Sequence, residues 1–242
     1  DKFYKNNNSI MSDIVKFVGI YDLNCTISKI SLENVYCKPR IIDQDKSVFL
    51  AKNIRHPIVE KINDNIEFVP NDISLDENGI LLYGTNACGK STLMKSIGLS
   101  LIMAQSGFFV PCSELIYSPY SQIFTRILSN DNLFRGQSSF AVEMSELRSI
   151  LKRSNNRSMV LGDELCSGTE SVSAQSIFAA SVIKLGKSNI NFIFATHLHE
   201  LNKMTQVSEL ENVKSFHLKV IFDEKSKILT YDRKLEEGNG PT

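Results

Sequence analysis

Apolar residues near the beginning of the chain follow a helical repeat. From residue 9 to about residue 35 they recur every three or four positions, which predicts a helix with one apolar face. That face contains Ile10, Ile14, Phe17, Val18 and Tyr21. The simplest interpretation is that this face packs against other apolar surface. Lys38-Pro39 ends the pattern, because the residue before a proline is disfavoured in a helix.

After residue 40 the apolar residues gather in short runs, which is typical of strands. The runs interpreted as strands are residues 47–50, 67–69, 80–83, 108–110, 159–161 and 192–195. Two helical stretches lie among them, from Ser91 to Gly107 and over residues 139–152. The last two runs are unbroken, as in strands that are buried on both faces of a parallel sheet. The alternation predicts an α/β fold with a mixed, mostly parallel sheet and flanking helices.

Composition narrows the class of protein. The 242 residues, 42% of them hydrophobic, suffice for one large domain or a domain with a small appendage. The 27 basic and 27 acidic side chains cancel, which argues against a surface dominated by nucleic-acid contacts. The five cysteines form no CxxC pair, so we expect neither a disulfide framework nor a zinc site, and a reducing, intracellular compartment. No apolar run reaches the roughly 18 residues of a membrane span.

A glycine-rich motif, Gly84-x-x-x-x-Gly89-Lys90-Ser91, follows the run at residues 80–83 and opens a helix. Glycines let backbone N–H groups surround phosphate oxygens, and the N-terminus of the next helix attracts the same anion. The motif predicts an ATP site, with Lys90 on the β and γ phosphates and Ser91 on Mg²⁺. Cys88 should be a reactive thiol, because Lys90 and the helix N-terminus both lower a thiol pKa.

A second motif is the acidic end of the run at residues 159–161, where Gly162-Asp163-Glu164 follows. Alone, such a pair would be two solvated acids at the end of a strand. The glycine-rich motif is a P-loop, and an apolar strand that ends in two acids further along the same chain matches a Walker B site. We expect Asp163 to hold Mg²⁺ through water and Glu164 to act as general base on the attacking water.

Two weaker motifs complete the pattern. His197 follows the run at residues 192–195 and, alone, would be an ordinary core or surface histidine. Behind the first two motifs it is interpreted as a γ-phosphate sensor, since a neutral imidazole both donates and accepts hydrogen bonds. Residues 135–140 (RGQSSF) precede a helical stretch. They predict either an ordinary N-cap or a second anion-binding helix N-terminus, of the kind that reaches phosphate across a dimer interface.

Together these motifs resemble the ATPase domain of the MutS family of mismatch-repair proteins, and the resemblance covers most of the chain. Its most specific stretches are residues 101–111 (LIMAQSGFFVP), 123–127 (IFTRI), 136–144 (GQSSFAVEM) and 195–201 (ATHLHEL). Residues 55–57 (RHP) and 68–72 (FVPND) are also similar. The resemblance implies an ABC-class P-loop ATPase fold with ATP and Mg²⁺ as cofactors.

The resemblance also assigns roles to individual residues. Asn86 would position water or phosphate inside the loop, Phe68 would lie near the adenine, and Ser138 would contact the partner subunit's γ-phosphate. The residues expected to bind ATP are Phe68, Gly84, Thr85, Asn86, Ala87, Cys88, Gly89, Lys90, Ser91 and Thr92, with Ser138 acting in trans. The expected catalytic residues are Glu164, Lys90, His197 and Asn86, and the expected metal ligands are Ser91 and Asp163.

The implied organisation has two parts. Residues 1–40 would be a helical stub of the core and lever region, and residues 41–242 the ATPase domain, with its C-terminal dimerisation element truncated. The implied function is that of a motor that gates a clamp on mismatched double-stranded DNA through a composite dimeric ATP site. DNA would be bound by domains outside this chain, and the partner would be a second MutS-type subunit, in a homodimer.

The chain departs from the family pattern in two loops. Thr85, Ala87 and Cys88 stand where the family usually has Pro, Met and Gly. Residues 165–171 (LCSGTES) replace the usual Ile-Gly-Arg-Gly-Thr-Ser in the loop that would cross the dimer interface. These departures resemble the divergent MutS branch of giant viruses and octocoral mitochondria.

Two alternatives stay open. One is the ABC-type ATPase of another machine, a transporter or a chromosome-maintenance protein, which the lack of a Leu-Ser-Gly-Gly-Gln string disfavours. The other is a nucleotide-gated dimerisation module without catalysis, which the presence of Lys90, Asp163 and Glu164 disfavours.

Overall fold

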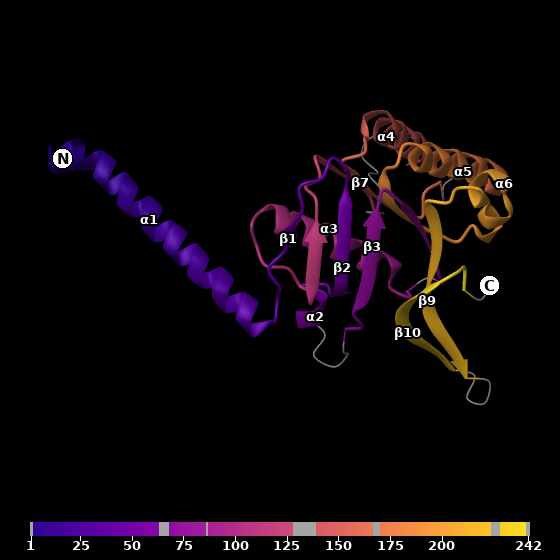
Figure 1. Ribbon diagram of the computed structural model, residues 1–242, viewed down its shortest axis with the longest axis horizontal. Helices are drawn as coiled ribbons and strands as arrows, with labels where there is room; N and C mark the ends of the chain where they lie inside the picture. The colour runs from indigo at the N-terminus through magenta and orange to yellow at the C-terminus, as the bar shows by residue number, and fades with distance from the viewer. Residues whose placement is uncertain are drawn as a thin grey trace.

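The computed structural model describes residues 2–62, 68–85, 87–127, 139–166, 170–223 and 228–240. In this part of the chain a long helix projects from a domain that holds two sheets and the helices around them (Figure 1).

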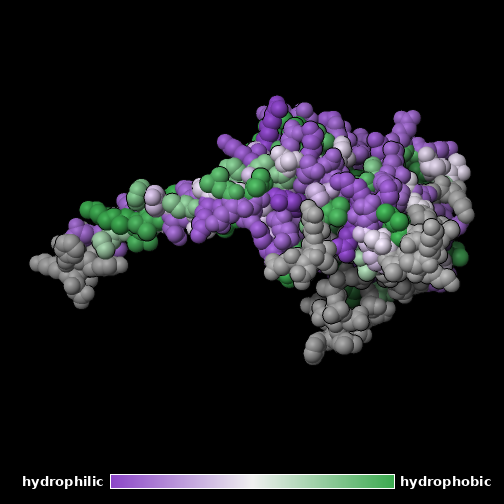
Figure 2. All heavy atoms as spheres, turned by 90° about the horizontal axis from the view of Figure 1, so that it is seen from below, coloured by the Kyte–Doolittle hydropathy of each residue, from purple (hydrophilic) through white to green (hydrophobic). Residues whose placement is uncertain are grey.

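The projecting helix is α1 (Lys2–Glu33), which confirms the predicted N-terminal helix. Its apolar face does not pack as expected, since Phe17 and Tyr21 expose 70% and 64% of their area. The helix extends away from the domain, so that apolar side chains line its surface (Figure 2). In the described ranges no helix, α1 included, is long and apolar enough to span a membrane.

Polar contacts fix the end of α1 to the domain. The Arg55 guanidinium donates hydrogen bonds to the carbonyl oxygens of Asn34 and Val35, at 2.9 and 3.2 Å. It also forms an ion pair with Glu60 at 3.2 Å, and Glu60 accepts a hydrogen bond from the Tyr36 hydroxyl at 3.0 Å. These contacts join the residues at the end of α1 to Arg55 and Glu60 of the domain.

The smaller sheet has the strand order β1 (Arg40–Ile41), β5 (Glu114–Tyr117), β2 (Val48–Ile54) and β3 (Asn71–Asp76). The predicted strand at residues 47–50 is confirmed within β2. The predicted strand at residues 67–69 is wrong, because β3 begins only at Asn71, after a proline that has no N–H for a ladder. Residue 67 itself lies outside the described residues. The short helix α2 (Val59–Ile62) follows β2.

The predicted strand at residues 108–110 is also wrong. The Phe108 N–H donates to the Met103 carbonyl at 2.9 Å and so closes the end of α3 (Lys90–Gln105). Val110 alone pairs, in an isolated bridge with Cys37. The apolar run thus belongs to a helix end and a loop.

The larger sheet has the order β10 (Ile228–Glu237), β9 (Val213–Asp223), β4 (Gly79–Tyr83), β8 (Asn191–Thr196), β7 (Ser158–Asp163) and β6 (Gln122–Arg126). Of these described strands only β10 runs antiparallel to its neighbour, which confirms the mostly parallel sheet. Every residue of β4, β7 and β8 is buried, as their unbroken apolar runs predict.

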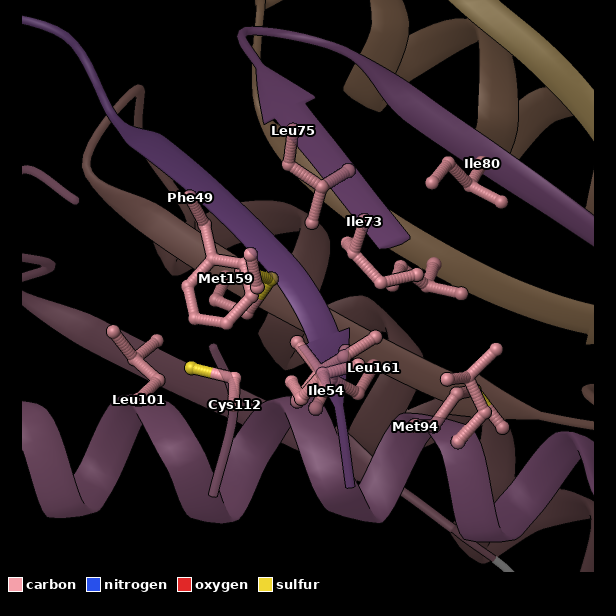
Figure 3. Packing of buried hydrophobic residues seen from close by; sticks show 14 of the residues in the cluster. Phe49, Ile54, Ile73, Leu75, Ile80, Met94, Leu101, Cys112, Met159 and Leu161 are labelled. Atoms are coloured by element: carbon pink, nitrogen blue, oxygen red, sulfur yellow. The ribbon is translucent and has the colours of Figure 1, made fainter. Parts of the chain in front are cut away.

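The central strands bury their two faces in different clusters. On β4, Leu82 belongs to the cluster of α3, which also takes in Met94 of the helix and Phe49 of the smaller sheet (Figure 3). Leu81 and Tyr83 belong to the opposite cluster. The helices of that second cluster are α4 (Ser139–Arg153), α5 (Ser171–Lys187) and α6 (Thr205–Ser208), with the 3-10 helix η2 (His199–Lys203) between β8 and α6. The two predicted internal helices are confirmed as α3 and α4.

Because β4, β7 and β8 are adjacent and parallel, the loops that follow them meet at one edge of the sheet. Both motifs with strong sequence signals, and His197, lie in these loops.

Candidate nucleotide-binding site

The loop between β4 and α3 has the backbone that a phosphate-binding turn needs. Gly84 and Gly89 have φ angles of 147° and 110°, and Ala87 has 65°. A Cβ at residue 84 would lie 2.8 Å from the Cys88 Sγ, so this position combines a left-handed backbone with close approach. Gly89 is the N-cap of α3, and Lys90 begins the helix. Backbone N–H groups at a helix N-terminus form a ready anion site.

A cavity of about 420 Å³ opens beside this loop. Such a volume lies in the usual range for small-ligand sites. The residues that line it are Thr85, Ala87, Gly89, Lys90, Ser91, Thr92, Lys95, Ile127, Asp163 and Glu164. The structure therefore brings the P-loop and the acidic end of β7 into one site, as the sequence predicts.

Lys90 is buried and held by the loop itself. Its ammonium donates hydrogen bonds to the carbonyl oxygens of Gly84 at 2.7 Å and Thr85 at 3.1 Å. Such anchoring restricts the side chain before any ligand arrives. The positive charge is thus placed inside the turn, next to the N-terminus of α3.

Ser91 and Asp163 both line the cavity and contact each other. The Ser91 hydroxyl donates a hydrogen bond of 2.5 Å to the Asp163 Oδ2. The Asp163 Oδ1 is buried and, among the described residues, has no hydrogen-bond partner. An unpartnered buried carboxylate oxygen is costly unless a cation or water satisfies it. One carboxylate and one hydroxyl also fit Mg²⁺, which is usually held by one or two carboxylates plus substrate phosphates and water.

Glu164 and His197 are in direct contact. The His197 Nε2 lies 2.6 Å from the Glu164 Oε1, although 33 residues separate them in the chain. Glu164 has a left-handed backbone with a φ of 48°, and its N–H donates to the Ala195 carbonyl at 3.0 Å. The sequence predicts separate roles for these two side chains and gives no sign of the contact. It arises because β7 and β8 are neighbours and end at the same level.

Cys88 differs from its prediction. The thiol is buried in the α3 cluster, and this burial raises its pKa in spite of the nearby Lys90. The expected reactive thiol in the phosphate turn is therefore wrong. The exposed Ala87 lines the cavity beside Cys88, whose side chain is buried.

We expect Cys88 to be alkylated far more slowly than Cys25, which is exposed on α1 and serves as an internal control. A thiolate is the reacting species, and both burial and the raised pKa reduce its population. Mass spectrometry of a timed alkylation would measure both rates in one sample. Equal rates in the absence of ATP would show that the Cys88 thiol faces the cavity.

Of the predicted site residues that the structure describes, Phe68, Gly84, Cys88 and His197 are not among those that line the cavity. Phe68 is partly buried in the segment before β3. Asn86 and Ser138 lie outside the described residues.

In turn, the predicted site residues lack two lining residues, Ile127 directly after β6 and Lys95, which is exposed on α3. The spacing of four residues between Ser91 and Lys95 places both on one helix face and could have revealed Lys95.

A strand–turn–helix with left-handed glycines, a lysine that begins the helix and a neighbouring strand that ends in two acids define a P-loop ATPase domain. Comparison with known proteins identifies the family to which this domain belongs. Residues 80–241 match the family model described as MutS domain V. The chain therefore belongs to the MutS family and carries its P-loop ATPase domain.

Similar proteins extend over nearly all of the chain. It is 37% identical to a mutS homolog of Acanthamoeba polyphaga mimivirus named for DNA mismatch repair, with 99% of the chain covered. It is 35% identical to the mitochondrial DNA mismatch repair protein mutS homolog of Sarcophyton glaucum, with 100% covered. It is 40% identical to the DNA mismatch repair protein MutS of Clostridium botulinum, with 90% covered. These alignments span 25%, 24% and 25% of the relatives, so the chain corresponds to about a quarter of their length. The resemblance to the giant-virus and octocoral proteins is thus confirmed.

Proposed function

We propose that this chain is the ATP-binding and ATP-hydrolysing domain of a MutS-type DNA mismatch-repair protein. The observation that carries the proposal is the convergence of Lys90, Asp163 and Glu164 on one cavity, with His197 in contact with Glu164. These side chains come from the ends of two adjacent parallel strands, β7 and β8, and from the start of α3, which follows the neighbouring strand β4.

Phosphate binding is the task of the P-loop. N–H groups of the turn and of the first turn of α3 face the anion, and the Lys90 ammonium exchanges its bonds to the Gly84 and Thr85 carbonyls for phosphate oxygens. Ser91 and Asp163 would hold Mg²⁺. When bound, the ion would neutralise charge that develops on the phosphate oxygens.

Hydrolysis is the task of Glu164. A water attacks the γ-phosphorus and gives its proton to the Glu164 carboxylate, while ADP leaves. The contact with the His197 Nε2 at 2.6 Å fixes the orientation of this carboxylate. His197 is thereby placed to respond to the state of the nucleotide through Glu164.

The proposal for the whole protein follows from its relatives. They are named for mismatch repair, and by analogy ATP turnover here would gate a clamp on mismatched double-stranded DNA. DNA would be bound by regions outside these 242 residues. The ATP site would be composite, with Ser138 of a second subunit, in a homodimer, on the γ-phosphate. A P-loop contacts the phosphate tail on one side. The other side of the γ-phosphate stays open to hydrogen-bond donors of a second subunit.

For this composite site we expect Ser138→Ala to lower ATP turnover about 10²-fold, as for other donors to transition-state charge, while ATP affinity stays unchanged. Mixing Ser138→Ala protein with Glu164→Gln protein should restore part of the activity. In the mixed dimer one site combines an intact Lys90 and Glu164 with the partner's intact Ser138. Phosphate release measured against mixing ratio tests this. If mixing gives no rescue and activity per chain is independent of concentration, the site works within one subunit.

A further inference from the structure

Glu143 is a buried carboxylate outside the nucleotide cavity. It lies about one turn into α4 and is 5% exposed. Carboxylates are almost never buried to this degree without a partner. Its partner is backbone, because the Glu143 Oε1 accepts a hydrogen bond of 2.7 Å from the N–H of Cys166. Bonds from an N–H to an ionised carboxylate are among the strong ones in proteins.

The segment that receives this bond begins with Glu164. Both Glu164 and Cys166 have left-handed backbones, with φ angles of 48° and 66°. Neither is a glycine, and such conformations persist only where the surroundings hold them. The beginning of the segment is held by the bond from the Glu164 N–H to the Ala195 carbonyl, at 3.0 Å. Its end is held by Glu143.

Packing beside the bond supports this arrangement. Leu165 and Cys166 are buried in the same cluster as Leu147 of α4, so α4 covers the end of the segment. Burial, and then the neighbouring Glu143 carboxylate, raise the pKa of the Cys166 thiol to about 11. The thiol therefore stays neutral next to the carboxylate. Without the Glu143 oxygen, the Cys166 N–H would be left buried and unpaired.

We propose that Glu143 is a positioning residue that holds the Glu164 carboxylate in its place in the cavity through the Cys166 N–H. The inference rests on the proposed ATPase function and adds to it the element that sets the geometry of the base. Among the described residues, Glu143 belongs neither to the cavity lining nor to the contact with His197, so it acts on hydrolysis and not on ATP binding.

The test compares two conservative variants. Glu143→Gln keeps the length of the side chain and one acceptor oxygen but removes the charge. Glu143→Asp keeps the charge but withdraws the oxygen by one methylene. We expect the Gln variant to stay within about threefold of wild-type kcat, and the Asp variant to lose up to about 10²-fold, the effect of a displacement near 1 Å in an active site. KM for ATP should be unchanged in both.

Glu146→Asp is the matched control on the same helix. Glu146 is half exposed and forms an ion pair at 2.9 Å with Arg126, whose side chain is 19% exposed. Aspartate keeps the charge at this position, and the carboxylate lies at the surface, outside the cavity lining. The turnover of Glu146→Asp protein should equal that of wild type.

The inference would be overturned if Glu143→Asp turned over ATP like wild type. It would also be overturned if the substitution changed KM for ATP as much as kcat. A Gln variant as impaired as the Asp variant would overturn it as well, since charge rather than placement would then matter.

Amide hydrogen exchange at Cys166 is a second test, and it remains valid if the Asp variant does not fold. In wild type the Cys166 amide should exchange slowly, like the amides of β7, and in Glu143→Gln it should stay slow. Exchange as fast as in exposed loops would overturn the inference. Wild-type and Glu164→Gln proteins run in parallel separate the claims. If the wild-type protein binds ATP but releases no phosphate, the proposed function fails. If Glu164→Gln is as active as wild type, Glu164 is not the base; if it is inactive while Glu143→Asp is fully active, only the role of Glu143 fails.

Discussion

Glu164→Gln protein should bind ATP with wild-type affinity and hydrolyse it about 10² to 10⁴ times more slowly, the usual contribution of a general base. The substitution keeps the size of the side chain and leaves an oxygen that accepts a hydrogen bond from His197. Its effect therefore isolates the loss of a group that can take the proton of the attacking water. Binding is measured by titration with ATP, and turnover by phosphate release.

A matched control lies at the end of α6. Glu209 is exposed at the C-cap of this helix, outside the cavity lining and the loop at residues 165–171. Glu209→Gln should turn over ATP like wild type. Should Glu164→Gln do the same, Glu164 is not the base, and the contact with His197 has another purpose.

Lys90→Ala protein should lose most of its affinity for ATP. A hydrogen bond to a charged group contributes about 1.5–3 kcal/mol, so the loss of two such bonds weakens binding roughly 10² to 10⁴-fold. The effect is large because Lys90 is buried and already oriented by the Gly84 and Thr85 carbonyls. Titration calorimetry with ATP would measure it.

Stability must be followed in the same experiment, since the substitution also leaves these two carbonyls without their donor. A melting temperature close to that of wild type would assign the lost affinity to the ligand contact. Lys187→Ala, at the exposed end of α5, is the control for removal of a surface lysine. ATP affinity equal to wild type in a folded Lys90→Ala protein would contradict the P-loop assignment.

Buried strands were the best-predicted part of the fold. The runs at residues 80–83, 159–161 and 192–195 are apolar at every position, as expected for strands that are covered on both faces of a sheet. Short apolar runs outside the central strands were harder to assign. Residues 68–69 and 108–110 are also apolar, but the first run precedes a proline, and Phe108 of the second closes the end of α3. Local composition does not distinguish these cases.

The periodic spacing of apolar residues predicts which side chains share a helix face. It does not predict which surface, if any, packs against that face. The apolar face of α1 is real, yet Phe17 and Tyr21 remain exposed in this chain. Similarly, the P-loop motif locates Cys88 next to Lys90 along the chain, but the direction of the thiol depends on packing under the turn. Contacts such as Glu164 with His197 and Glu143 with Cys166 join distant residues, so they require the fold itself.

Hydrolysis of ATP in the cavity between the P-loop and the end of β7 can be measured as phosphate release from ATP by the wild-type protein, with Mg²⁺ and then with the metal chelated. The proposed roles of Ser91 and Asp163 predict steady release with Mg²⁺ that stops on chelation and resumes when Mg²⁺ is restored. Binding of ATP without any phosphate release under these conditions would show that this cavity does not hydrolyse ATP.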